Sequence, residues 1–387
     1  MLDQTKRILA DLIAFPTVSA DSNLDMIAYL AQRLEDCGAQ VDVMTDPSGR
    51  KANLFATMGP HVDGGIVLSG HSDVVPVTDQ DWTSDPFKMV ERDGRLFGRG
   101  TCDMKGFIAA TIAMAPNLRQ QIRDRPLHFA FTYDEETGCI GAGQLIEDLT
   151  ARGTKPSVAI IGEPTNMRII EGHKGCHEYS THFHGLEGHG SAPDLGVNAV
   201  EMAVRYVTRL LDLREDVKNL APDDSPFDPP WTTLNIGALN GGQVHNVIPA
   251  KASVDWEMRP VQQADAAYVN DALATYCNNV LLPVVRTIHP DASITTEVIG
   301  EVAGLIPTNS NEARKIMSEL TGANTADVVS FGTEAGLFQS IGMDVVICGP
   351  GSIEQAHKAD EFLALDQLAE CLKMMDGLGF RLAESRV

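Results

Sequence analysis

The segment Gly-Ile-Val-Leu-Ser-Gly-His-Ser-Asp, residues 65–73, shows the pattern from which the fold of this chain can be worked out. Its apolar part, residues 65–69, has the length of a strand and stops at a glycine. His71 is then expected at the end of this strand, where Asp73 can fix which imidazole nitrogen faces a metal ion. Taken alone, a loop histidine beside a solvated aspartate explains the segment equally well.

The same order of apolar run, turn and acidic residue occurs twice more along the chain. Leu127–Thr132 precedes the pair Glu135 and Glu136, and the run 158–161 precedes Glu163 in Gly-Glu-Pro. Predicted helices lie between these runs, at 107–118 and 141–149. This alternation predicts an α/β fold with a mostly parallel central sheet flanked by helices, in which functional residues follow the strands.

Two further candidate ligands lie in glycine-rich turns. Asp103 is surrounded by Gly98, Gly100 and Gly106, which favour a cramped backbone over a helix or strand. His357 follows the turn Cys-Gly-Pro-Gly at 348–351. A plain glycine turn is the alternative reading of each segment.

Together these residues form a ligand set for two metal ions. Each ion would take one of His71 and His357 together with one terminal carboxylate, and the third carboxylate would be shared. Glu135, beside the candidate ligand Glu136, is left over as a proton acceptor. Although adjacent acids usually mark an exposed turn, the whole set indicates hydrolysis. The five candidate ligands are His71, Asp103, Glu136, Glu163 and His357.

The pattern changes near residue 176 and returns near residue 300. In between, the order of predicted elements is β-α-β-β-α-β, which is typical of a small two-layer α/β domain. We therefore expect a discontinuous metal-binding catalytic domain, residues 1–175 and 300–387, with an inserted lid/dimerisation domain at 176–299.

Bulk composition narrows the possible partners. The net charge of −23 argues against binding to nucleic acid or to an anionic membrane surface. Seven cysteines without a Cys-x-x-Cys pair favour reduced thiols over a disulfide framework. The N-terminus lacks the apolar core of a signal peptide, and no stretch has the length of a membrane span. These features predict a cytoplasmic protein.

With these motifs in this order, the chain resembles the zinc-dependent aminoacylase and carboxypeptidase family over essentially its whole length. The resemblance implies two divalent ions, Zn²⁺ first, with Co²⁺ or Mn²⁺ as alternatives. It assigns the five ligands named above, makes Asp103 the bridge before a cis peptide bond, and makes Glu135 the general base. The resemblance also implies that Asp73 contacts His71 and orients its imidazole toward the metal ion.

The inserted domain adds a second group of family-like residues. His189, in Gly-His-Gly-Ser-Ala-Pro, resembles a histidine that reaches an active site across a homodimer and hydrogen-bonds the scissile carbonyl. Asn246 and Arg259 resemble residues that hold a substrate carboxylate, for which the planar guanidinium is suited. A turn histidine and a surface ion pair are the respective alternatives for His189 and Arg259.

The segment Ser-Phe-Gly-Thr-Glu-Ala-Gly bears on the substrate. The resemblance makes Gly332, Thr333 and Glu334 substrate-binding residues, with Glu334 the candidate partner of a cationic side chain. A structural glutamate at a helix start is the alternative. The implied activity is hydrolysis of a small N-acyl amino acid, with N2-acetyl-L-ornithine as the expected substrate. Succinylated diaminopimelate, other N-acyl amino acids, dipeptides and a catalytically silent binding protein stay open.

Overall fold

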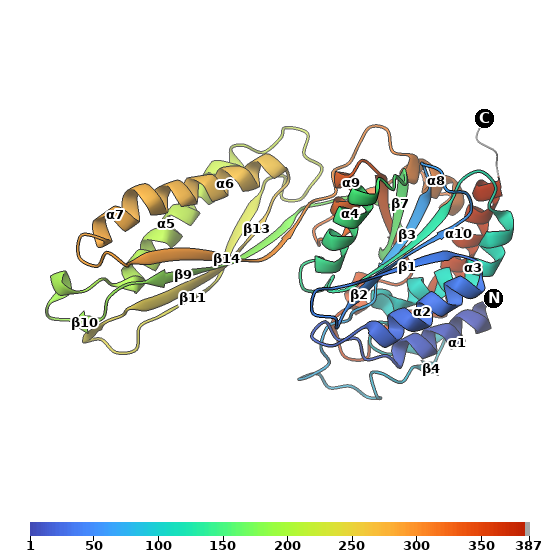
Figure 1. The fold of residues 1–387 in the computed structure, drawn as a ribbon, viewed down its shortest axis with the longest axis horizontal. Coiled ribbons are helices and arrows are strands. Elements are labelled where there is room, and N and C mark those ends of the chain that lie inside the picture. The colour runs from blue at the N-terminus through green and yellow to red at the C-terminus, as the bar shows by residue number, and fades with distance from the viewer. Residues whose placement is uncertain (384–387) are drawn as a thin grey trace. The chain divides into compact units, whose positions relative to one another are not determined.

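The computed structural model describes residues 1–383, which form two compact units. Unit 1 comprises residues 1–172, 305–328 and 333 onwards, and unit 2 comprises residues 173–304 and 329–332 (Figure 1). Unit 1 is thus discontinuous in the sequence, because its segments both precede and follow those of unit 2. The functional labels of catalytic domain and lid/dimerisation domain stay predictions.

An eight-stranded sheet forms the centre of unit 1, in the order β1-β2-β6-β3-β7-β16-β8-β15. The four inner strands β6, β3, β7 and β16 run parallel to one another, and the pairs β1/β2, β2/β6 and β8/β16 are antiparallel. The prediction of a mostly parallel central sheet is confirmed. The strands are β1 (Gln40–Thr45), β2 (Ala52–Met58), β3 (Ile66–His71), β6 (Leu127–Thr132), β7 (Val158–Pro164), β8 (Ile170–His173), β15 (Asp327–Val329) and β16 (Asp344–Gly349).

Helices cover both faces of this sheet because its strands are apolar on both sides. In β3, Ile66 and Leu68 join the large core cluster, whereas Val67 is buried on the opposite face. The first face is covered by α1 (Leu2–Ile13), α2 (Leu24–Asp36), α3 (Gly106–Gln121), α8 (Glu312–Thr321) and α10 (Leu365–Ala383). The second is covered by α4 (Ile140–Arg152) and α9 (Ala335–Ser340), which contact β6 and β16, respectively.

Helix α3 is apolar on nearly all sides, and its packing explains why. It contacts both α1 and α10, so the run from Phe107 to Ala115 is buried around the whole circumference. The helix starts directly after the turn that carries Asp103, so its packing fixes that turn against the core.

Unit 2 is a two-layer α/β structure around a four-stranded antiparallel sheet, in the order β11-β13-β9-β14. Two helices cover one face, where alternate strand residues such as Tyr179, Phe183 and Val254 are buried. The elements are β9 (Cys176–His184), α5 (Ala199–Lys218), β11 (Thr233–Gly241), β13 (Lys251–Arg259), α6 (Gln263–Tyr276), α7 (Leu282–Val285) and β14 (Ser293–Val302).

Several short elements were not predicted from the sequence. A small sheet of β4 (Val90–Arg92), β5 (Arg95–Phe97) and β17 (Phe362–Ala364) joins a loop before Asp103 to the segment after His357. Unit 2 contains the two-residue pair β10 (Gly188–His189) and β12 (Val247–Ile248). Within residues 1–383, no helix is long and apolar enough to cross a bilayer.

Candidate metal centre and active site

The candidate ligands gather at one edge of the sheet of unit 1. His71 is the last residue of β3, Glu163 lies near the end of β7, and Glu136 follows β6 by a short turn. His357 comes after β16 by way of a glycine turn. Because β3, β6, β7 and β16 are parallel, their carboxyl ends meet at the same edge.

Asp103 lies between the two imidazoles. Its Oδ1 is 3.0 Å from Nε2 of His71, and its Oδ2 is 3.4 Å from Nε2 of His357. The turn Thr101–Lys105 that carries it has non-helical dihedral angles at Asp103, and the peptide bond to Met104 is cis, as the resemblance implied. One carboxylate thus offers one oxygen to each half of the cluster.

Each imidazole has a second carboxylate nearby. Nε2 of His71 lies 3.8 Å from Oε1 of Glu163, and Nε2 of His357 lies 3.0 Å from Oε2 of Glu136. Ligand atoms of His71, Asp103 and Glu136 all lie within 4.8 Å of one another, as do those of His71, Glu135 and Glu163. The structure therefore brings all five candidate ligands together.

The donor set fits divalent cations. Oε1 of Glu163 is buried and accepts no hydrogen bond from the described residues, so a negative charge on this oxygen carries a cost of burial. Burial, and then the charge of Asp103, raises the pKa of Glu163 well above its usual value. Positive ions between these groups would offset both the burial of negative charge and the repulsion between Glu163 and Asp103. A set of imidazole and carboxylate ligands suits Zn²⁺, Co²⁺ or Mn²⁺.

The negative charges of the cluster also shift the pKa values of its two imidazoles. Burial alone would lower the pKa of His71, but its contacts with Asp103 and Asp73 outweigh burial and raise it well above the ordinary value. Hydrogen bonds to Asp103 and Glu136 raise the pKa of His357 to about 10. Both shifts have the same cause, the negative charge of the surrounding carboxylates, which a bound cation would also offset.

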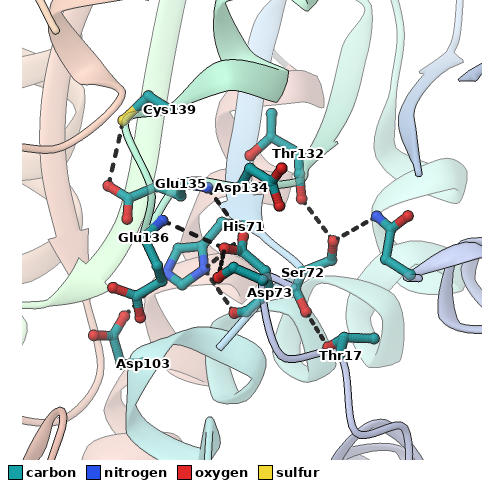
Figure 2. Close-up of polar contacts among 12 residues, drawn as sticks. Thr17, His71, Ser72, Asp73, Asp103, Thr132, Asp134, Glu135, Glu136 and Cys139 are labelled. Carbon is teal, nitrogen blue, oxygen red and sulfur yellow. Dashed lines mark hydrogen bonds and ion pairs between the residues drawn. The ribbon is translucent and has the colours of Figure 1, made fainter. Parts of the chain in front are cut away.

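Asp73 supports the site in two ways (Figure 2). Nδ1 of His71 lies 2.9 Å from the main-chain oxygen of Asp73 and 3.5 Å from its Oδ1, which leaves Nε2 directed at Asp103. The carboxylate also accepts hydrogen bonds from the backbone N–H groups of Glu135 and Glu136, and from the hydroxyl of Ser19. One side chain therefore sets the position of a candidate ligand and of the adjacent acid pair.

Glu135 has the environment of a general base. It is half-buried, and burial, together with the charges of Glu136, Asp103 and Asp73, raises its pKa well above the usual value despite the opposing charge of His71. A raised pKa makes a carboxylate a better proton acceptor near neutral pH.

The predicted residues of unit 2 fall into two separate places within that unit. His189 is exposed, and Nδ1 of its ring lies 2.7 Å from the hydroxyl of Ser191. Asn246 is next to it, since its main-chain oxygen accepts a hydrogen bond from the N–H of Gly190. Arg259 instead ends β13, where its guanidinium pairs with Glu257 at 2.8 Å.

Thr333 and Glu334 lie at the start of α9 in unit 1, whereas Gly332 belongs to unit 2. Glu334 is completely buried, and its carboxylate accepts hydrogen bonds from the hydroxyls of Ser69 and Thr132. Contact between Glu334 and a substrate stays a prediction, because neither oxygen faces solvent here.

Sequence reasoning missed several residues that contact this site, among them Ser19, Cys139 and Glu361. Ser19 lies in the loop between α1 and α2, where no local pattern marks it. Cys139 follows the acid pair closely, and Glu361 follows His357 closely, so proximity to a candidate ligand was the one available signal.

Comparison with known proteins gives the class of this protein. Residues 67–379 match the model of peptidase family M20/M25/M40. The chain belongs to this family and is a metal-dependent amidohydrolase. It is 36% identical to the acetylornithine deacetylase of Shigella sonnei (strain Ss046), over 359 residues that cover 91% of each chain.

Solved structures share the fold at lower identity. An M20 metallo-carboxypeptidase from Sulfolobus solfataricus superposes with a TM-score of 0.76 at 17% identity, covering 98% of this chain and 99% of that one. A tripeptidase from Staphylococcus aureus gives a TM-score of 0.73 at 19% identity, covering 99% of both chains. A dinuclear metal-binding M20 peptidase from Bacillus subtilis gives 0.62 at 17% identity, covering 99% and 98%.

Proposed function

We propose that this enzyme hydrolyses the amide bond of N2-acetyl-L-ornithine to give L-ornithine and acetate, a step of arginine biosynthesis. The observation that carries the reaction type is Asp103 between His71 and His357, with Glu135 alongside. The substrate is inferred from the acetylornithine deacetylase that is 36% identical to this chain.

Two divalent ions would be held by the five clustered side chains. His71 and Glu163 would bind one ion, His357 and Glu136 the other, and Asp103 would bind both. Zn²⁺ is the first candidate, and Co²⁺ or Mn²⁺ would occupy the same ligands according to supply. When bound, such ions supply Lewis acidity, which polarises an acyl carbonyl and lowers the pKa of water.

Glu135 would move the proton. Its carboxylate accepts a proton from the attacking water and later delivers this proton to the leaving amine. The hydrogen bond from the N–H of Glu135 to Asp73, 3.1 Å long, holds the backbone that positions this carboxylate. Proton transfer from a side chain placed in this way contributes ~10²–10⁴-fold to turnover.

We further propose that the active site is shared between two copies of the chain. His189 would hydrogen-bond the scissile carbonyl, and Arg259 and Asn246 would orient the substrate carboxylate. His189 pairs with Val247, just before the start of β13, whereas Arg259 is the last residue of that strand. A nine-residue strand is roughly 26 Å long.

A small substrate cannot span that length, so His189 and Arg259 of one chain cannot both touch it. If both residues act, they come from different protomers, which supports a homodimer formed through unit 2. None of the seven cysteines, all of which lie within residues 1–383, forms a disulfide, in keeping with the proposed cytoplasmic location.

The proposal is tested by a substrate panel on protein whose metal content has been counted. We expect release of acetate from acetylated ornithine to exceed turnover of acetylated neutral amino acids and of succinylated diaminopimelate at matched concentrations. Chelation should abolish activity, and Zn²⁺ or Co²⁺ should restore it. Faster turnover of succinylated diaminopimelate would reassign the substrate, and activity that survives thorough chelation would eliminate the mechanism.

The same panel tests Glu334. If this carboxylate receives the substrate ammonium, Glu334→Gln raises KM for acetylated ornithine and leaves KM for acetylated neutral amino acids unchanged. Equal effects on both substrates would assign Glu334 to the support of Ser69 and Thr132 instead.

A further inference from the structure

We propose that Glu361 is the positioning residue that holds the shared carboxylate of Asp103 in place for both metal ions. Glu361 is only 1% exposed and lies between His357 and β17. The inference rests on the proposed two-metal function, and it concerns a residue that touches neither the candidate ligand atoms nor the substrate.

Four hydrogen bonds reach the two oxygens of Glu361. Oε1 accepts from the backbone N–H groups of Cys102, at 2.8 Å, and Asp103, at 3.1 Å. Oε2 accepts from the N–H of Gly100, at 3.0 Å, and from the guanidinium of Arg99, at 2.7 Å. The side chain therefore binds almost the whole turn from which Asp103 projects.

The turn needs such a support because it has no regular structure of its own. Asp103 and Met104 have non-helical dihedral angles, and Gly100 has a φ of 84°. A side chain at Gly100 would strain this backbone, and its Cβ would lie 2.8 Å from Val74. Without the carboxylate, three backbone donors in a buried turn would lose their acceptor.

Arg99 extends this support to the other half of the centre. Its guanidinium donates to Oε1 of Gln80 at 2.6 Å, and Nε2 of Gln80 donates to the main-chain oxygen of His357 at 2.9 Å. Its charge also lies 5.1 Å from the ring centre of Trp82. A continuous chain of contacts thus runs from the Asp103 turn through Glu361, Arg99 and Gln80 to the His357 loop.

An amide cannot replace this carboxylate. All four partners of Glu361 are donors, so the NH₂ group of a glutamine would face at least one of them. Groups that orient metal ligands typically change metal affinity by roughly 10–100-fold when they are altered. Because Asp103 faces both imidazoles, the loss should affect both ions.

The experiment titrates the metal-free protein with Co²⁺ and follows heat and the visible absorption of the bound ion. We expect wild-type protein to bind two ions, and Glu361→Gln to bind both roughly 10–100-fold more weakly with a changed spectrum. Glu361→Asp keeps the charge and should recover part of the affinity. Wild-type affinity and spectrum in Glu361→Gln would overturn the inference.

A matched control removes a different ion pair in unit 1. Glu312 pairs with Arg125, which also donates to the main-chain oxygen of Gly64 near the opposite ends of the strands. Glu312→Gln should bind Co²⁺ like wild type. Equal weakening in both variants would mean a general loss of stability and would contradict a specific role for Glu361.

A second variant covers the case in which Glu361→Gln does not fold. Gln80 is half-buried, and Gln80→Ala removes the link from Arg99 to His357, together with the hydrogen bond that Gln80 accepts from the indole of Trp82. We expect one of the two Co²⁺ ions to bind more weakly, and unchanged binding of both would count against the network. A wild-type protein that binds no Co²⁺ would instead refute the proposed function itself.

Discussion

The thiol of Cys139 lies 3.6 Å from Oε1 of Glu135, within reach of a weak hydrogen bond (Figure 2). Cys139 is buried, and burial, followed by the charge of Glu135, raises the pKa of its thiol well above the usual value. The group therefore stays a neutral donor next to the candidate base, and it restricts where that carboxylate can point.

Removing this donor should slow turnover without affecting substrate binding. A weak hydrogen bond of this kind is worth about 0.5–1 kcal/mol, so Cys139→Ala should lower kcat by roughly 2–5-fold at unchanged KM. Cys139→Ser keeps a donor and should be closer to wild type. Steady-state kinetics would show this, with Cys371→Ala, a buried cysteine in α10, as the control for loss of a thiol.

Glu135→Gln should separate metal binding from proton transfer. The variant keeps the side-chain shape but cannot accept a proton, so we expect kcat to fall by ~10²–10⁴-fold with the metal content retained. Glu147→Gln, an exposed acid on α4, should behave like wild type in the same assay. Turnover within a few-fold of wild type in metal-loaded Glu135→Gln would remove Glu135 from the role of base.

Mixing two inactive variants tests whether the site is shared between copies. Glu135→Ala lacks the candidate base of unit 1, and His189→Ala lacks the exposed imidazole of unit 2. If His189 acts in the partner's site, dissociation and reassociation of the mixture should restore part of the activity. Glu135→Ala mixed with His71→Ala should restore none, since both changes lie in unit 1, and equal results for the two mixtures would argue against sharing.

His128 should make the metal-free protein less stable in acid. It lies in β6 of unit 1, and burial, together with the nearby charge of His61, lowers its pKa to about 4. Between pH 6.5 and 4 the folded chain therefore binds fewer protons at this site than the unfolded chain. The free energy of unfolding is therefore unaffected by this group above pH 6.5. As the pH drops from 6.5 to 4, protonation of His128 in the unfolded chain lowers it by ~3 kcal/mol.

Urea unfolding of the metal-free protein at several pH values measures this effect. His128→Asn removes the titrating ring, so its unfolding free energy should fall less steeply with acid than that of wild type. His245→Asn, at an exposed position, should follow the wild-type curve. An unchanged pH slope in His128→Asn would show that this imidazole is not the cause.

The sequence predicts the sheet and the meeting of the candidate ligands for one physical reason. Strands such as 66–71 and 158–164 are apolar on both faces, so they must lie inside a helix-covered parallel sheet, and the carboxyl ends of parallel strands adjoin. His71, Glu136 and Glu163 lie together because of this topology. No comparable rule placed Asp103 or His357, because their glycine-rich turns marked them as candidates without fixing where in the fold they lie.

Other features depend on contacts that no local pattern encodes. Glu334 carries the signal of a helix start, yet its burial against Ser69 and Thr132 arises from strands far away in the chain. The support of the Asp103 turn by Glu361 joins residues 258 positions apart. Helix α6 ends at Tyr276, and a π-helical segment, Cys277–Leu281, joins it to α7, which no local sequence pattern indicates.

The position of β16 has a consequence for how the protein is made. This strand lies between β7 and β8 in the sheet, although the ribosome synthesises all of unit 2 before it. Until residue 349 has left the exit tunnel, β7 lacks its partner strand β16. The unpaired backbone groups along that side of β7 can then pair with a wrong strand. Chaperone protection would therefore matter from the emergence of β7, before half of the chain has been made, until the end of translation.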